Sequence, residues 1–489
     1  MKKVTVDPIT RLEGHGKIEI FVNDAGEVAN VYFQIPELRG FERFCVGRPV
    51  EELARITPRI CGVCPEAHHM AATKAIDAVF GVEVAPAGRL LRELLYNAFY
   101  VTDHTTHFYI LAGPDFIMGP QSDPAARNIL GVVGKVGLET AGAMINLRAE
   151  AAELISMIGG KQIHPVCGLP GGVSTSITAE QRDRMVQITT GMVEFAKFTL
   201  QLFDDVVLKN NDYVDLIKSD AFNHATYNMG MVDANNKVNF YDGQIRVTGQ
   251  DGSELERFDG KDYLDHIAEH VEPYSYLVYP YLKSVGWKGF VDGKDSGVYR
   301  ASPLSRLNAA DGMATPLAQA EYERYFSTLG GKPVNATLAT HWARLVELLY
   351  AAERAHELAT DPEIINPDVR TIPTGIVGEG VGVVEAPRGT LYHHYKTDDK
   401  GMVTNVNLIV GTTNNNAAIS MSLKKAAEGL IKGGTEIGEG TLNMIEMAFR
   451  AYDPCFGCAT HTLPGDMPLE VTVKSESTRD VITSVKRNM

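Results

Sequence analysis

Apolar residues recur at three- and four-residue spacing along several long stretches of the chain, which is typical of helices with a buried face. Some of these stretches are apolar on more than one side, as at Leu94, Leu95, Ala98, Phe99 and Tyr100. Helices of that kind pack in the middle of a bundle. The pattern therefore predicts five long helices, over residues 65–80, 89–112, 125–158, 179–208 and 336–359.

Other segments have the patterns of strands and turns. Residues 17–35 alternate apolar and polar on both sides of Asp24, Ala25 and Gly26, which predicts an N-terminal β-hairpin. Glycine, aspartate and asparagine become frequent over 224–302, and runs such as VNFYDGQIRVTG at 238–249 indicate further hairpins. We expect a β-rich insertion there.

The stretch 363–415 is rich in proline and glycine, and we expect it to be irregular. Helical patterning returns at 417–431 and 441–450. These patterns predict an α+β fold that is mainly helical, with a central bundle of long helices, the N-terminal hairpin and the β-rich insertion. We expect one large fold over 1–461, with parts at 1–36 (hairpin), 50–220 and 316–361 (helical core), 224–302 (insertion) and 363–461 (C-terminal region).

Composition and charge narrow the class of protein. With 489 residues, 44% hydrophobic and 22% charged, the chain resembles an ordinary globular protein rather than a disordered or fibrous one. A net charge of -15 has the wrong sign for neutralising phosphates, so we expect no nucleic-acid partner. Asp7 and Arg11 interrupt any apolar leader, and the uncharged stretch 403–423 is rich in asparagine. We therefore expect neither a signal peptide nor a membrane span.

The cysteines carry the strongest chemical signal. Four of the six form two C-x-x-C pairs, Cys61 with Cys64 and Cys455 with Cys458. In a chain without a secretion signal, such pairs more often bind metal or do redox work than form structural disulfides. The remaining two, Cys45 and Cys167, have no partner at ligand spacing, and we expect them to be small buried apolar residues.

The two pairs lie far apart in sequence. Zinc ribbons separate their cysteine pairs by about 15 to 20 residues, whereas Cys61 and Cys455 are 394 positions apart. The whole fold must therefore assemble any shared site. Four thiolates in a buried place would select zinc, an iron-sulfur cluster or another thiophilic transition metal. A structural four-cysteine zinc site and two separate redox dithiols are the alternatives.

Further motifs surround these pairs. They are R-x-E-G-H at 11–15, R-x-C-G-x-C-x-x-x-H at 59–68, E-A-P-R-G at 385–389 and D-P-C-x-x-C-x-x-H at 453–461. Together, and in this order, they resemble the large subunit of a nickel-iron hydrogenase over nearly the whole chain. The segments CGLPGGVS at 167–174 and EAPRGTLYHHY at 385–395 resemble those of the cytosolic methyl-viologen-reducing type, which supplies electrons to heterodisulfide reductase.

The resemblance implies a catalytic role for the cysteines. In the family all four cysteines hold nickel, and two bridge to an iron that carries carbon monoxide and cyanide. By motif position, Cys61 and Cys455 would be terminal ligands, and Cys64 and Cys458 would bridge. The implied reaction is the reversible heterolytic cleavage of dihydrogen to protons and electrons, with Cys455 as the first base. Glu13 matches the proton gate of the family.

The resemblance also assigns residues around the metals. Arg388 matches the arginine above their open face, where it can donate to cyanide, and Asp103 and Asp453 match the carboxylates that hold it. His68 matches a histidine that donates a hydrogen bond near a bridging sulfur. Three residues match the stretch that packs the iron ligands, with glycine where the family commonly has proline: Val410, Gly411 and Thr412.

A magnesium ion lies beneath the site in relatives. Glu42, the carbonyl of Leu408 and His461 match its ligands, and magnesium prefers oxygen ligands. Relatives are also trimmed after this histidine by a maturation protease once nickel is in place. The resemblance therefore implies that 462–489 is removed and that nickel-insertion chaperones act on the chain.

Electron transfer requires other proteins, because the chain has no further C-x-x-C pairs for an iron-sulfur relay. The resemblance implies an iron-sulfur small subunit, with further electron-acceptor subunits such as a heterodisulfide reductase complex, in the cytoplasm. Two alternatives to the catalytic subunit stay open: a structural four-cysteine zinc protein and a non-catalytic hydrogenase-like subunit.

Overall fold

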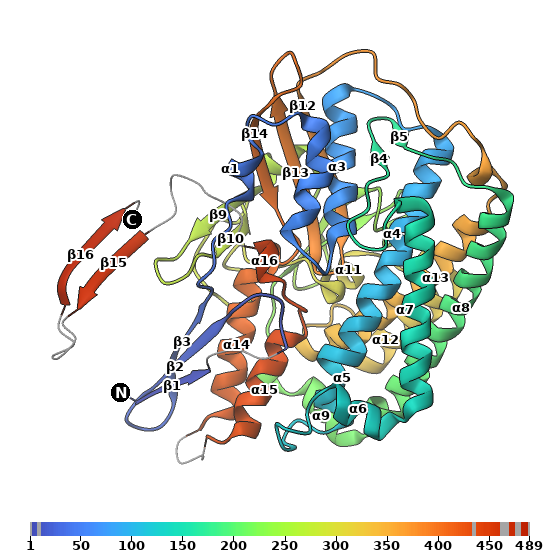
Figure 1. Ribbon diagram of the computed structural model, residues 1–489. Helices are drawn as coiled ribbons and strands as arrows, with labels where there is room; N and C mark the ends of the chain where they lie inside the picture. The colour runs from blue at the N-terminus through green and yellow to red at the C-terminus, as the bar shows by residue number, and fades with distance from the viewer. Residues whose placement is uncertain (1, 7–10, 433–436, 460–468, 475–480, 488–489) are drawn as a thin grey trace.

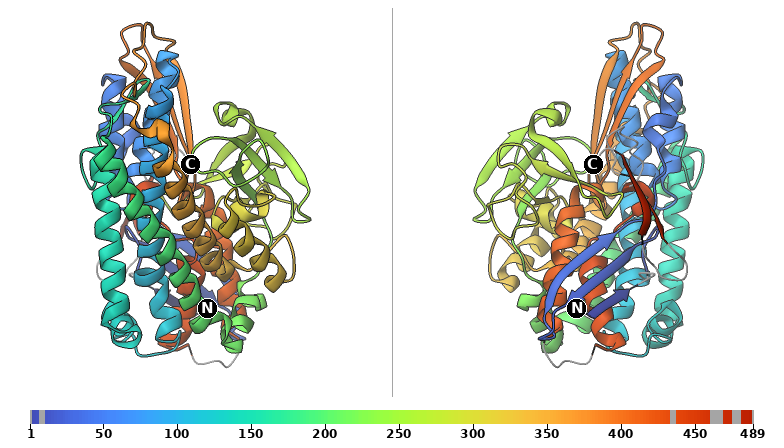
Figure 2. Two further views of the ribbon diagram at one scale, coloured as in Figure 1. Left: turned by 90° about the vertical axis from the view of Figure 1, so that its right-hand side faces the viewer. Right: turned by 90° about the vertical axis from the view of Figure 1, so that its left-hand side faces the viewer.

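The computed structural model describes residues 2–6, 11–432, 437–459, 469–474 and 481–487. Long helices form one side of the molecule, and small sheets form the other (Figures 1 and 2). The predicted α+β class with a bundle of long helices is confirmed. The long helices that pack together are α4 (Pro86–Thr106), α7 (Leu138–Gly159), α8 (Ala179–Phe203) and α13 (Thr340–Thr360).

An antiparallel three-stranded sheet lies between the long helices and the β-rich segment (Figure 2). Helix α3 (Pro65–Phe80) packs on one face of this sheet. A Cβ atom at Gly382 would lie 2.0 Å from the carbonyl oxygen of Ala71. Only glycine lets the helix backbone approach so closely. The strands are β12 (Glu379–Ala386), β13 (Gly389–Thr397) and β14 (Val403–Ile409).

The prediction that 363–415 is irregular is therefore wrong over 379–409. The glycines at 380 and 382 indicated a loop, but in the structure they are the contact between strand β12 and helix α3. A sequence pattern cannot distinguish a flexible glycine from one that makes room for a neighbouring backbone.

The other face of this sheet packs on the β-rich segment. Tyr392 and Ile409 join a second hydrophobic cluster, with Met229 and Val247 of the insertion. The predicted β-rich insertion is confirmed, but 238–249 is not a hairpin: only β7 is a strand, and it pairs with β6 and β8. The turn residues within that run resemble a hairpin loop, whereas β6 lies earlier in the chain. The strands are β6 (Tyr227–Val232), β7 (Gln244–Thr248), β8 (Glu254–Phe258), β9 (Ile267–Val271), β10 (Val278–Leu282) and β11 (Tyr299–Arg300).

The N-terminal hairpin is present as β2 (Lys17–Val22) and β3 (Val28–Gln34). A strand that the sequence did not indicate, β1 (Lys2–Val6), pairs with β2 and makes a three-stranded sheet. Strand β3 packs against α14 (Asn416–Leu430), which is followed by α15 (Glu439–Arg450). This arrangement places the chain's first strands beside its last long helices (Figure 1).

The predicted helix over 125–158 is interrupted. Gly137 has φ 89°, a conformation that favours glycine, and it separates α6 (Ile129–Val136) from α7. Apolar spacing continues on both sides of the break, which explains the single predicted helix. Two other predicted helices end in π-helical turns, η3 (His107–Ala112) after α4 and η4 (Asp204–Leu208) after α8.

The remaining described elements are short. Of the helices in the described part of the chain, none is long and apolar enough to cross a membrane. Within the predicted extension, β15 (Leu469–Lys474) and β16 (Val481–Arg487) pair with each other. The other elements are α1 (Phe41–Cys45), α2 (Leu53–Ile56), η2 (Thr57–Ile60), α5 (Gly113–Ile117), β4 (Gly168–Leu169), β5 (Gly172–Val173), α9 (Asn211–Lys218), α10 (Tyr263–His266), α11 (Pro303–Ala309), α12 (Pro316–Leu329) and α16 (Phe456–Ala459). Short 3-10 turns are η1 (Val50–Glu52), η5 (Asp220–Phe222), η6 (Gly260–Asp262), η7 (Thr337–Ala339), η8 (Pro362–Ile365) and η9 (Thr413–Asn415).

Candidate metal centre

The fold brings the two distant cysteine pairs together. The four sulfur atoms of Cys61, Cys64, Cys455 and Cys458 lie within 4.8 Å of one another, and all four residues are buried. Cys61 Sγ is 3.2 Å from Cys455 Sγ, and Cys64 Sγ is 3.5 Å from Cys458 Sγ. Each contact joins one end of the chain to the other, as the spacing of the pairs requires.

The local backbone structure orients the first cysteine pair, Cys61 and Cys64, toward the site. Cys64 is the N-cap of helix α3, and Pro65 occupies the first turn. An N–H at that position has no partner within the helix, so proline loses no hydrogen bond there. The N–H groups of Val63 and Cys64 donate to Cys61 Sγ at 3.2 and 3.3 Å. Donors that point at a sulfur favour its thiolate form.

The donor set is suited to a soft cation. Hydrogen bonding from neighbouring thiols, Cys455 first, lowers the pKa of Cys61, whereas burial raises the pKa of both Cys455 and Cys458. Four thiolates therefore need a positive charge among them. Sulfur ligands select thiophilic transition metals, which fits nickel and iron.

Glu13 lies against the second pair. The Cys455 thiol donates to Glu13 Oε2 at 3.0 Å, and the Gly457 N–H donates to the same oxygen at 2.8 Å. The backbones also meet, since the Phe456 N–H donates to the Glu13 carbonyl at 3.0 Å. Burial raises the pKa of Glu13. Arg11 anchors this segment by donating to the Leu111 carbonyl at 2.8 Å.

Arg388 is held by two carboxylates. Its Nη1 lies 2.9 Å from Asp103 Oδ2, and its Nη2 lies 2.7 Å from Asp453 Oδ2. Asp453 has φ 53°, an uncommon conformation for a residue other than glycine. Arg388 Nε is buried and has no hydrogen-bond partner in the described part of the chain. The guanidinium therefore has a buried donor, its Nε–H, left for a ligand.

A small cavity lies between the cysteines and Arg388. The predicted iron-packing residues line it, and the Cys455 N–H donates to Thr412 Oγ1 at 3.0 Å. A Cβ atom at Gly389 would lie 2.2 Å from the Gly411 carbonyl oxygen, so the backbones behind the cavity touch. The lining residues are Cys64, Ala67, His68, Ala386, Arg388, Leu391, Val410, Gly411, Thr412, Cys455 and Cys458.

The structure adds residues that the sequence analysis did not select. His68 Nδ1 is 3.1 Å from His393 Nε2, and His393 Nδ1 is 2.5 Å from Tyr395 Oη. His393 and Tyr395 are two positions apart on β13 and therefore share a face, but that spacing gave no reason to choose this strand. This chain of three polar side chains fixes the orientation of His68.

Two further side chains support the Arg388 loop. Asn415 Nδ2 donates to the Arg388 carbonyl at 2.7 Å, and Arg344 Nη1 donates to the Pro387 carbonyl at 3.1 Å. The asparagine run at 414–416 is a visible sequence feature, whereas nothing in the sequence distinguishes Arg344 from other helical arginines. Both residues were missed.

The predicted hard-cation ligands lie together in part. Glu42 of α1 accepts a hydrogen bond from the Leu408 N–H at 2.7 Å. Burial raises the pKa of Glu42 to about 8. His461 lies outside the described residues.

The two isolated cysteines match their prediction. Cys45 and Cys167 are buried, and burial raises the pKa of each to about 12. Both are therefore neutral thiols.

Comparisons with known proteins agree with this centre. A family model described as nickel-dependent hydrogenase matches residues 39–125 and 298–461, and a HoxL-like model matches residues 3–38. An F420-non-reducing hydrogenase iron-sulfur subunit from Archaeoglobus profundus is 50% identical, covering 97% of each chain. An F420-non-reducing hydrogenase subunit from Methanothermobacter marburgensis is 41% identical, covering 99% of this chain and 100% of its own.

Solved structures show the same fold. The crystal structure of an NAD+-reducing [NiFe]-hydrogenase in the H2-reduced state superposes with a TM-score of 0.86. The identity is 36%, covering 94% of this chain and 100% of the other.

The chain belongs to the nickel-dependent hydrogenase family and is a hydrogenase large subunit. It is an oxidoreductase subunit that cleaves dihydrogen reversibly at a nickel-iron site and works within a multisubunit enzyme. Within the family it groups with the F420-non-reducing hydrogenases, in agreement with the predicted methyl-viologen-reducing type. A zinc protein or a non-catalytic relative fits these findings less well.

Proposed function

We propose that Cys61 and Cys455 would hold nickel alone and that Cys64 and Cys458 would be shared by nickel and iron. The observation that supports this proposal most directly is the cavity beside the four cysteines. Cys64, Cys455 and Cys458 line it, whereas Cys61 does not. A second metal with small ligands would therefore lie on the side of Cys64 and Cys458, away from Cys61, and the motif position of Cys455 assigns Cys455 to nickel.

The side chains that line this cavity suit carbon monoxide and cyanide as ligands of the iron. Arg388 lines it and has an unpaired buried Nε–H, which can donate to a cyanide nitrogen. Val410 and Leu391 provide an apolar wall for a ligand that accepts no strong hydrogen bond. Thr412 lines the cavity as well, next to Cys455.

Nickel and iron held by these cysteines would supply the Lewis acidity that polarises dihydrogen. Cys455 Sγ takes the proton as the nearby base. Glu13 Oε2, 3.0 Å away, then receives the proton, and the Gly457 N–H holds that oxygen in place. Asp103 and Asp453 keep the Arg388 cation fixed above the site, so that it needs no rearrangement during the reaction.

A divalent cation, magnesium by its preference for oxygen, completes the lower part of the site. The Glu42 carboxylate lies against the Leu408 backbone, whose N–H donates to it, so Glu42 and Leu408 are close enough to contribute to one site. A cation would also offset the cost of burying the Glu42 carboxylate. His461 would be the third ligand.

The electrons leave through an iron-sulfur small subunit, from which they reach further acceptor subunits such as a heterodisulfide reductase complex. The resemblance to the cytosolic branch supports a cytoplasmic location. Nickel-insertion chaperones would load the chain, and a protease would then remove 462–489. Mass spectrometry of active enzyme should find a C-terminus at His461, and an intact tail in active material would contradict the trimming.

Metal analysis and infrared spectroscopy of the purified complex test the centre. We expect nickel, iron and the infrared bands of carbonyl and cyanide ligands. Zinc without these bands would refute the proposal, and a metal-free complex would indicate the non-catalytic subunit.

A further inference from the structure

Three polar side chains form a buried row behind the metal centre. His68 Nδ1 lies 3.1 Å from His393 Nε2, and His393 Nδ1 lies 2.5 Å from Tyr395 Oη. All three residues are fully buried. Bulk water therefore reaches neither contact, and each contact must be a hydrogen bond with one donor and one acceptor. We call these three residues the histidine relay.

Two glycines make room for the histidine relay. His393 and Tyr395 lie on β13, opposite Gly382 and Gly380 of β12. A Cβ atom at Gly380 would lie 2.3 Å from a backbone oxygen of α3, an approach similar to that at Gly382. Because neither glycine has a side chain, α3 packs directly on this face of the sheet and brings His68 to His393.

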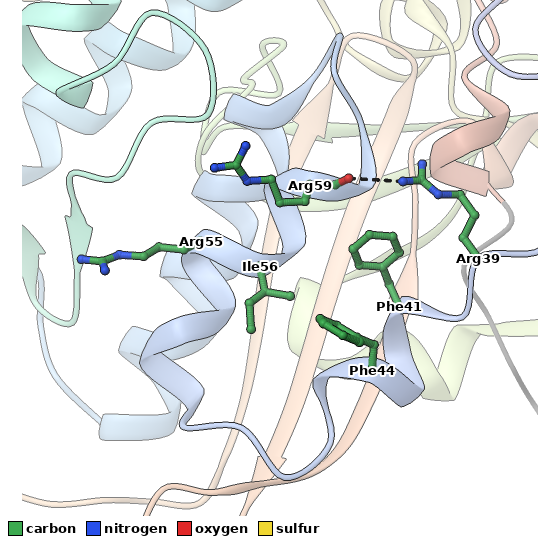
Figure 3. Close-up of a pocket in the computed structure, with 6 residues that line it drawn as sticks. All are labelled: Arg39, Phe41, Phe44, Arg55, Ile56 and Arg59. Carbon is green, nitrogen blue, oxygen red and sulfur yellow. Dashed lines mark hydrogen bonds between the residues drawn. The ribbon is translucent and has the colours of Figure 1, made fainter.

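Helix α3 is also held at its N-terminal end. Arg39 donates to the Arg59 carbonyl at 3.3 Å (Figure 3) and to the Gly457 carbonyl at 3.2 Å. Arg59 is two residues before Cys61, in the segment that leads into α3. The backbone that carries His68 therefore does not depend on the relay for its position. Loss of the relay should change the proton and the orientation of the His68 ring and leave the helix in place.

The chemistry of the three groups sets the direction of both hydrogen bonds. Burial raises the pKa of Tyr395 well above its usual value, so Tyr395 is a neutral phenol. A phenol is a much stronger acid than a neutral imidazole, so the Tyr395 O–H donates to His393 Nδ1. A neutral imidazole has one donor and one acceptor nitrogen. His393 therefore donates from Nε2 to His68 Nδ1, which leaves the proton of His68 on its Nε2.

His68 lies beside the sulfur ligands. It is one turn after Cys64 on α3, so the two side chains are on the same face of the helix. Both residues line the cavity of the metal centre, together with Cys458. An N–H that donates to a thiolate withdraws electron density from the sulfur, and such bonds tune the metal that the sulfur binds.

We propose that His393 and Tyr395 are positioning residues that keep the proton of His68 on Nε2. The His68 ring then donates a hydrogen bond to the sulfur ligands that line the cavity. Neither His393 nor Tyr395 lines that cavity, and both act through His68. This inference rests on the proposed function, in which Cys64 and Cys458 would be shared by nickel and iron, and it adds what controls the electron density of that pair.

Infrared spectroscopy of the purified complex tests the relay. His393→Leu keeps a side chain of similar size and removes the donor to His68. The sulfur should then donate more electron density to iron, and iron should pass more of it into the antibonding orbital of carbon monoxide, so the carbonyl band should move to lower wavenumber. Dihydrogen turnover should fall about 10- to 100-fold, the usual effect of losing a hydrogen bond behind a metal ligand. An unmoved carbonyl band in metal-loaded His393→Leu would overturn the proposal.

A conservative variant separates hydrogen bonding from packing. The side-chain amide of His393→Gln can donate to His68 Nδ1 from nearly the position of the imidazole Nε2–H. The carbonyl band and the turnover should therefore return close to those of the unsubstituted complex. Equal behaviour of His393→Leu and His393→Gln would show that packing alone matters and would overturn the proposal.

The neighbouring histidine provides the matched control. His394 is next on β13 and lies on the opposite face, where its Nδ1 is 3.1 Å from Tyr263 Oη. His394→Leu makes the same chemical change outside the relay and should leave the carbonyl band in place. A shift as large as that of His393→Leu would contradict the relay.

Tyr395→Phe gives an independent measurement, since it keeps the ring and removes only the phenol O–H. The proton of His393 is then no longer fixed, so the carbonyl band should move in the same direction as in His393→Leu, by a smaller amount. An unmoved band in Tyr395→Phe would overturn the proposal even where His393→Leu takes up no metal. Absence of carbonyl and cyanide bands from the unsubstituted complex would instead refute the proposed function.

Discussion

Glu13 Oε2 lies 3.0 Å from Cys455 Sγ, although 442 positions separate the two residues. Backbone pairing between the same segments, from the Phe456 N–H to the Glu13 carbonyl, fixes the contact independently of the side chains. The carboxylate is therefore placed by the main chain rather than by a flexible loop. Proton transfer over such a distance needs little rearrangement.

Glu13→Gln removes the proton-carrying group and keeps the shape. We expect dihydrogen turnover to fall roughly 10²- to 10⁴-fold, the usual contribution of general acid-base catalysis. Nickel and iron contents should be unchanged, as measured by plasma mass spectrometry. Glu51→Gln, at an exposed position of η1, is the control and should retain activity. Full turnover by Glu13→Gln would exclude the proton-gate role.

Gly457→Ala should displace the Glu13 carboxylate. A Cβ atom at Gly457 would lie 2.5 Å from Glu13 Oε1, and a flexible side chain can move away at little cost in stability. Displacement by about 1 Å can slow a reaction about 100-fold. We therefore expect a stable, metal-loaded enzyme with slow turnover, measured by dye reduction and thermal unfolding. Gly142→Ala has no atom within 4 Å and is the control; similar activities in both variants would argue against this mechanism.

Arg388→Lys should lose one of two carboxylate contacts, because an ammonium group lacks the planar fork of a guanidinium. We expect turnover to fall about 100-fold and the cyanide infrared bands to shift, since the donor near the iron ligands changes. Arg354→Lys is a suitable control, since Arg354 also bridges two carboxylates, Glu93 at 2.8 Å and Glu357 at 3.0 Å, outside the site. Unshifted bands in Arg388→Lys would rule out the cyanide contact.

Gly382→Ala should separate α3 from β12. Its Cβ would lie 2.0 Å from the Ala71 carbonyl oxygen, a backbone atom that cannot rotate away. Overpacking of this kind costs about 1–3 kcal/mol of unfolding free energy, and the shift of α3 should also lower nickel content. Denaturant unfolding and metal analysis measure the two effects. Gly375→Ala, with no atom within 4 Å, should change neither; a normal nickel content in a destabilised Gly382→Ala would separate the helix contact from metal binding.

The two cysteine pairs were predictable from their close spacing, and the resemblance carried by the short motifs pointed to Glu13 and Arg388. The structure brings all of them to one place. The long helices were predictable for the same reason, since their signal repeats within a few residues.

Features that depend on distant neighbours were not predictable. The sheet β12–β14 looked irregular because the space for α3 is visible only in three dimensions. Arg344 and His393 support the site through contacts with residues far along the chain. Their neighbours in sequence give no sign of those contacts, because tertiary packing overrides local preference.

The separation of the two sulfur pairs has a consequence for biosynthesis. A ribosome makes Cys61 and Cys64 first, and Cys455 and Cys458 follow 394 positions later. A nascent chain thus offers half a binding site while the intervening residues are made. Complete coordination becomes available only after the second pair has been synthesised, so a metal ion cannot be fully coordinated before that point.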